Sequence, residues 1–199
     1  MGAVFAIEHE GVVYMAADAV KHNGSSMIYV NDRSNLKIRL LPSGILCGAI
    51  GKGRAAQRMY LHDEWFTLAE GERFDRRFLI EKIVPRFYEE MKALDLLDKP
   101  DDGVNTAKVD AGFIFAKGSD IYMMYNDFSV IKCAGLAALS DGNLDGLMRT
   151  YAEACGEREP LALIRKTFNF ASRVRNNISM HGYVINTRDL EFMKMEDPA

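Results

Sequence analysis

Short apolar runs separated by turn residues dominate the first fifty residues, and this pattern predicts β-strands. The runs are nearly continuously apolar, so we expect both of their faces to be covered by other parts of the protein. Glycine, serine, asparagine and proline cluster between the runs, as is typical of turns. The expected strands span residues 3–7, 12–18, 36–41 and 45–50.

Two stretches with helical spacing of apolar residues follow. The first spans residues 53–68, and the second begins at Asp75, which is a suitable N-cap. Pro85 lies inside the second stretch, so we expect a kink or a restarted helix there. Residues 97–108 are polar and contain proline and glycine, so they are expected to form a loop.

The second half of the chain repeats this alternation. Strands are expected at 110–116 and 121–126, on either side of a hairpin turn at 117–120, and a third at 130–134. Two helices should follow, one opening near 141–143 and one at Glu159–Pro160, where proline takes the favoured first position. Residues 182–187 and 190–195 should form a last pair of strands.

The order of these elements predicts the fold class. Strands, two helices, strands, two helices and strands follow one another, and the strands come in hairpins, which disfavours a parallel βαβ sheet. The pattern favours an α+β fold, in which two packed antiparallel sheets form a four-layer αββα sandwich with a helix pair on each outer face. We expect one domain over residues 1–199.

Composition excludes several classes of protein. An apolar fraction of 48% and a charged fraction of 27% are ordinary for a soluble globular protein, and the net charge of −3 argues against a nucleic-acid binder. No apolar run is long enough for a membrane span, and the N-terminus does not resemble a secretion signal. Cys47, Cys133 and Cys155 lack metal-binding spacing, which favours reduced core thiols in a cytoplasmic protein without a metal or another cofactor.

Three chemically distinctive positions stand in the β-rich front of the chain. Asp18 ends the second run, Lys37 lies inside a later apolar run, and Gly48 precedes the expected first helix together with Gly51. This order resembles the start of a proteasome-type β subunit, an N-terminal-nucleophile hydrolase. The resemblance also implies the αββα sandwich.

In that family the first residue is a threonine whose hydroxyl attacks an amide carbonyl, while its free α-amine acts as the base. A lysine lowers the pKa of both groups, an aspartate holds the lysine, and a glycine N–H stabilises the oxyanion. The resemblance assigns the last three roles to Lys37, Asp18 and Gly48. Singly, each residue has an ordinary explanation. Asp18 could be a solvated turn carboxylate, Lys37 an outward lysine on an edge strand, and Gly48 part of a tight turn that needs glycine. Their order favours the proteasome-type interpretation.

The downstream matches are weaker. Ser140 is nearest to the family's serine in a small-residue turn, although a helix N-cap would explain it equally well. Where the family has an acid and a serine after the last long helix, this chain offers Asn177 and Ser179. A polar loop is the alternative for these two residues.

The position that aligns with the catalytic threonine is Gly2, which brings an α-amine and no side-chain nucleophile. The usual threonine-peptidase mechanism therefore lacks its central group. Cys47 adjoins Gly48 and is a fallback nucleophile, but it is better explained as a small apolar core residue.

Three hypotheses follow. The preferred one is a non-catalytic proteasome-like protein that self-associates into a ring or double ring and acts as a scaffold or binds a peptide or protein. The second is an active peptidase or amidohydrolase with a non-standard nucleophile, such as the Gly2 amine or a bound water, or with a differently processed N-terminus. The third is a small-molecule binder. Its anion pocket would be formed by Arg173, Arg175, Asn177 and residues 181–183, although a solvated helix end is the plainer explanation.

Overall fold

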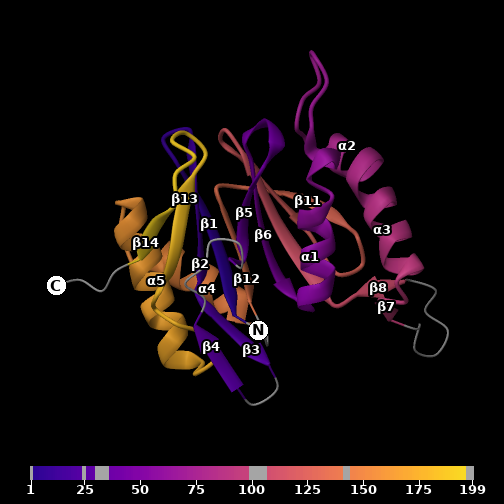
Figure 1. Cartoon of the computed structure of the whole chain (residues 1–199). Helices are drawn as coiled ribbons and strands as arrows, with labels where there is room; N and C mark the ends of the chain where they lie inside the picture. Colours follow the sequence, from indigo (N-terminus) through magenta and orange to yellow (C-terminus); the bar gives the residue numbers. More distant parts are fainter. Residues whose placement is uncertain (1, 24–25, 30–35, 99–106, 141–143, 196–199) are drawn as a thin grey trace.

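Two antiparallel sheets of five strands each pack face to face, with helices on both outer sides (Figure 1). This arrangement comes from a computed structural model, which describes residues 2–23, 26–29, 36–98, 107–140 and 144–195. The predicted four-layer αββα sandwich is confirmed. Sequence-adjacent strands pair as hairpins, as the element order predicted.

The first sheet has the order β12-β1-β2-β13-β14. Its strands are β1 (Ala3–His9), β2 (Val12–Asp18), β12 (Leu136–Ser140), β13 (Gly182–Asn186) and β14 (Met193–Met195). The second sheet has the order β11-β10-β9-β6-β5. Its strands are β5 (Ile38–Leu41), β6 (Ile45–Gly51), β9 (Ala111–Lys117), β10 (Asp120–Met124) and β11 (Val130–Cys133). Two short ladders join β3 (Val20–Asn23) to β4 (Ser26–Tyr29) and β7 (Leu97–Asp98) to β8 (Lys108–Val109).

The helices lie in two groups that cover opposite sheets (Figure 1). The second sheet is covered by α1 (Gly53–Leu61), α2 (Arg76–Phe78) and α3 (Val84–Ala93), with a π-helical segment η4 (Leu79–Ile83) between α2 and α3. The first sheet is covered by α4 (Leu144–Ala154) and α5 (Pro160–Val174). Two short 3₁₀ segments, η2 (Pro42–Gly44) and η3 (Asp63–Phe66), complete the helical elements of the described residues.

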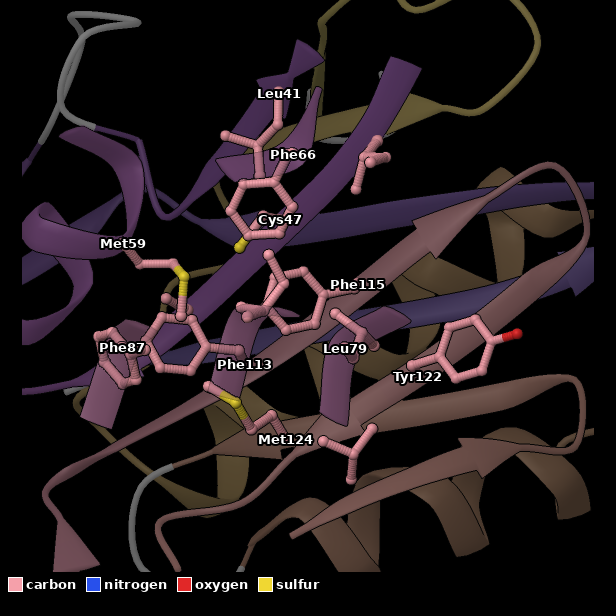
Figure 2. Close-up of a cluster of buried hydrophobic side chains, with 14 of the residues drawn as sticks. Leu41, Cys47, Met59, Phe66, Leu79, Phe87, Phe113, Phe115, Tyr122 and Met124 are labelled. Atoms are coloured by element: carbon pink, nitrogen blue, oxygen red, sulfur yellow. The ribbon is translucent and has the colours of Figure 1, made fainter. Parts of the chain in front are cut away.

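Among the described residues, three large hydrophobic cores hold the four layers together, and a small fourth cluster joins Ala19, Leu36 and Tyr183. Successive side chains of β1 point to opposite faces of the sheet and so enter two different cores. Phe5 points into the core under α4 and α5, whereas Val4 and Ala6 point into the core between the sheets. The third core lies under α1 and α3 and is rich in phenylalanine, including Phe113 and Phe115 (Figure 2). Because both faces of these strands are buried, the nearly continuous apolar runs in the sequence are explained.

Several local predictions are confirmed. The Asp75 carboxylate accepts a hydrogen bond from the Phe78 N–H at 2.8 Å, as expected of an N-cap. Pro85 lies at the start of α3, directly after the π-helical segment, so the helix restarts there. Pro160 stands in the first turn of α5. Residues 117–120 form the β9–β10 hairpin.

Other predictions were wrong. The helix expected over 53–68 ends at Leu61, because His62 leaves helical geometry at φ −96° and ψ 47° and a 3₁₀ segment follows. Ser140 belongs to strand β12 and not to a turn, because residues 136–140 pair with β1. The ends of the expected loop 97–108 pair as β7 and β8. Its middle and the expected helix start at 141–143 lie outside the described residues.

Candidate functional site

Gly2 lies at the start of β1 in surroundings that admit no side chain. Its φ of +140° is a conformation that residues with a Cβ rarely adopt. A Cβ added to Gly2 would lie 1.9 Å from the Lys37 Nζ and 2.6 Å from the Asp18 Oδ1. The lysine nitrogen therefore occupies the space in which a nucleophilic side chain at position 2 would begin.

Asp18 and Lys37 form a buried ion pair beside Gly2. Asp18 ends β2, its side chain is fully buried, and its Oδ1 accepts hydrogen bonds from the Ala3 N–H and from Lys37 Nζ, both at 2.7 Å. Lys37 Nζ also donates to the Val20 carbonyl at 2.5 Å. Burial lowers the pKa of Lys37, while the charge and hydrogen bond of Asp18 oppose that shift. The contact between aspartate and lysine that the family resemblance implies is thus present in the structure.

The segment that carries Lys37 is fixed by its own backbone. The Lys37 carbonyl accepts a hydrogen bond from the Ala49 N–H at 2.9 Å and one from the Tyr60 hydroxyl at 2.7 Å. Tyr60 projects from α1, and burial raises the pKa of its hydroxyl well above the usual value. The sequence does not reveal this contact, because helical spacing gives no sign of a hydrogen bond to a carbonyl 23 residues away.

Gly48 lies in the middle of β6, next to β1. A Cβ at this position would approach the Val4 Cγ1 to 2.5 Å, so the glycine lets the two sheets come close beside the start of β1. Gly48 is therefore near the predicted site and has a packing reason to be glycine. Cys47 points the other way, into the core under α1 (Figure 2). Burial raises the pKa of its thiol well above the usual value, which argues against a nucleophile.

Ser140 stands opposite Ala3 in the pairing of β12 with β1, one residue from Gly2 along the strand. Within the described residues its buried Oγ has no hydrogen-bond partner. Ser140 also lines a cavity of about 570 Å³, between the ends of β6, β9 and β12 and the start of α4. Besides Ser140, the cavity is lined by Ile50, Gly51, Lys52, Asp110, Ala111, Gly112, Tyr125, Asn126, Leu139 and Asp145.

Asn177 and Ser179 lie between α5 and β13. The Ser179 hydroxyl accepts a hydrogen bond from the His181 N–H at 3.0 Å, and the His181 carbonyl accepts one from the Ala19 N–H at 2.9 Å. Since Gly182 pairs with Asp18, this segment runs beside the end of β2. Asn177 is half-buried in the same loop.

The residues of the suggested anion pocket are divided between a helix end and a strand. Arg173 is exposed in the last turn of α5, whereas Tyr183 is buried within β13. The described residues contain no cluster of three or more histidine, cysteine, aspartate or glutamate side chains placed to hold a metal ion. None of the helices in the described part of the chain has the length and apolar character needed to cross a membrane.

Comparison with solved structures identifies the fold. No protein-family model matches the chain, and no curated protein matches its sequence. The BPH protein of Thiobacillus denitrificans is similar with a TM-score of 0.65 at 16% identity, over 98% of this chain and 100% of that one. Anbu from Hyphomicrobium sp. strain MC1 gives 0.69 at 13% identity, over 98% and 87% of the two chains. HslV from Trypanosoma brucei gives 0.64 at 14% identity, over 92% and 98%.

The chain therefore has the proteasome-type N-terminal-nucleophile hydrolase fold, as its motif order suggested. The similarity extends over nearly the whole chain at low sequence identity. Within that fold, Gly2, Asp18 and Lys37 meet at the start of β1.

Proposed function

We propose that this protein is a non-catalytic proteasome-like protein that acts as an oligomeric scaffold or binding protein and lacks threonine-peptidase activity. The observation that carries the proposal is the contact at Gly2, where Lys37 Nζ lies within 1.9 Å of the place for a side chain. A hydroxyl-bearing residue would need both a different backbone conformation and a displaced lysine. The fully buried Cys47 and the hydrogen-bonded Ser179 offer no replacement nucleophile.

Epoxomicin labelling tests this proposal. Thiobacillus denitrificans BPH has been solved in complex with epoxomicin, so it serves as the positive control. The purified full chain should show no mass increase after incubation with the probe, and it should not cleave a panel of fluorogenic peptides. An epoxomicin adduct on this chain, with peptide cleavage that the probe inhibits, would overturn the proposal, and peptide mapping would name the nucleophile.

Self-association is the second part of the proposal. Large apolar side chains are exposed on the outer helices: Leu61 is 67% exposed, Leu147 51% and Val174 44%. Large apolar side chains on the surface lose contact with water when another protein surface covers them, so they favour association. Light scattering during size-exclusion chromatography should give a mass at least twice the 22.4 kDa of one chain, and a monomer at micromolar concentration would contradict this part. Cytoplasmic location remains our prediction, and the three free cysteines support it.

An active amidohydrolase is the second candidate. It is favoured by the Asp18 Oδ2, a buried carboxylate oxygen without a hydrogen-bond partner among the described residues, which a bound water or substrate N–H would satisfy. A screen of amide and peptide substrates separates the two candidates. Turnover that is lost in Lys37→Ala would favour the enzyme.

A further inference from the structure

We propose that His62 is a proton-operated switch, which accepts a hydrogen bond from Arg58 when it is neutral and donates one to Glu90 when it is protonated. His62 directly follows α1, and Glu90 belongs to α3, so the switch lies where these two helices meet. This property goes beyond the scaffold function proposed above and does not depend on it.

The contact of Nδ1 determines which ring nitrogen carries the hydrogen in neutral His62. Nδ1 lies 3.1 Å from the Glu64 Oε1. A carboxylate oxygen only accepts hydrogen bonds, so this contact requires a hydrogen on Nδ1. Neutral His62 therefore has its hydrogen on Nδ1 and a lone pair on Nε2.

The other ring nitrogen, Nε2, lies between a donor and an acceptor. The Arg58 Nη2, which can only donate, is 3.3 Å away, and the Glu90 Oε1, which only accepts, is 3.5 Å away. One nitrogen cannot serve both groups at once. The lone pair of neutral Nε2 accepts from Arg58, whereas protonation replaces this lone pair by an N–H that donates to Glu90.

Protonation also replaces an attraction between His62 and Arg58 by a repulsion. The guanidinium of Arg58 stays charged, and its Nε–H donates to the Glu90 Oε1 at 2.5 Å, so only Nη2 has to turn away from the charged ring. Arg58 lines a surface cavity of about 550 Å³, which gives Nη2 space to move. The switch therefore controls how much positive charge faces this cavity.

Charged side chains from three elements surround the imidazole. They are Arg58 of α1, Asp63 and Glu64 of η3, and Arg86 and Glu90 of α3. The carboxylates stabilise a charged ring, and Arg58 opposes it. The His62 side chain is 26% exposed, so water can deliver the proton.

Nuclear magnetic resonance of the imidazole nitrogens tests the proposal on the native full chain. The ¹⁵N signals of His62, assigned by their loss in His62→Gln, are followed from about pH 8 to about pH 5, the range in which an imidazole titrates. The hydrogen should lie on Nδ1 at the upper end and on both nitrogens at the lower end. The side-chain ¹⁵N signals of Arg58 should shift with the same midpoint, because its partner changes. The fluorescence of Trp65 should follow as well, since its ring is stacked on the imidazole with centroids 4.4 Å apart.

Charge-removing variants with matched controls test the two partners. Arg58→Gln should raise the midpoint of the His62 titration by about 0.5 pH unit, and Glu90→Gln should lower it by about as much. Arg54→Gln on α1 and Glu89→Gln on α3 make the same charge changes at exposed positions. These controls should move the midpoint by less than about 0.2 pH unit, because solvent screens exposed charges.

The wild-type tautomer decides even where a variant does not fold. If neutral His62 carries its hydrogen on Nε2, the ring cannot accept a hydrogen bond from Arg58 and the proposal is overturned. It is also overturned if the Arg58 signals do not follow the titration, or if the controls move the midpoint as far as the two partner variants. The result is independent of the epoxomicin experiment, because the ring signals need no peptide cleavage.

Discussion

Gly2→Ala combined with changes at Lys37 tests the central contact of the site. The added Cβ would lie 1.9 Å from Nζ, so the lysine must leave its position, and the buried Asp18 loses its counter-ion. Removing one partner of a buried ion pair costs about 3–5 kcal/mol. The φ of +140° at position 2 adds strain of about 1–3 kcal/mol for a residue with a Cβ. Gly2→Ala should therefore remove a large part of the free energy of unfolding.

The same substitution should be far cheaper when the ion pair is absent. In the double variant Asp18→Asn, Lys37→Ala, no ammonium has to move and no carboxylate is left unpaired. Gly2→Ala should then cost only the backbone strain of about 1–3 kcal/mol. Both costs are measured by urea unfolding, which is monitored by circular dichroism and by the fluorescence of Trp65, the single tryptophan of the chain. The difference between the two backgrounds is the coupling between residue 2 and the pair. Equal costs in both backgrounds would refute the proposed contact.

Three further outcomes can be checked by urea unfolding. Tyr60→Phe should cost about 0.5–1.5 kcal/mol, because it removes one of the two hydrogen bonds that the Lys37 carbonyl accepts. Tyr151→Phe, which keeps its ring stack, should cost less than about 0.5 kcal/mol. Gly182→Ala should be strongly destabilising because its Cβ would lie 2.1 Å from a backbone oxygen, whereas Gly146→Ala, with open space in α4, should stabilise by about 0.5–1 kcal/mol. Burial raises the pKa of Glu90, but its hydrogen bond and ion pair with Arg58 lower the pKa by more, so the net shift is downward. The stabilisation from Glu90 is therefore fully present above its unfolded pKa of about 4.3 and is lost as the pH falls through the lower folded pKa. The difference in unfolding free energy between wild type and Glu90→Gln should shrink as the pH falls below about 4.3.

The layered fold could be predicted because its signals are local. Apolar runs of strand length, separated by turn residues, define hairpins, and helical spacing defines the covering layers. Strand β12 was missed because Ala137 and Ala138 have weak β-propensity, and pairing with β1 determines their conformation. The early end of α1 at His62 was missed because the apolar pattern continues into a 3₁₀ segment.

The candidate site could be predicted only in part. The family resemblance implied that Asp18 and Lys37 lie together, and in the structure Lys37 Nζ lies 2.7 Å from the Asp18 Oδ1. The sequence showed that Gly2 has no nucleophile, but it gave no reason to expect the lysine in the vacant place, because that depends on how β1 and the segment before β5 meet. The hydrogen bond from Tyr60 has the same origin, since helix α1 and the Lys37 carbonyl become neighbours only when the second sheet is assembled.

Retention of the acid and the lysine is therefore not evidence for peptidase activity. The Asp18 Oδ1 accepts the Ala3 N–H at the start of β1, so this carboxylate is buried whenever β1 is in place. A buried carboxylate without a counter-charge is costly, so the fold needs a cation at this point whether or not any reaction takes place. Lys37 meets that need, and the absence of a Cβ at Gly2 lets it approach.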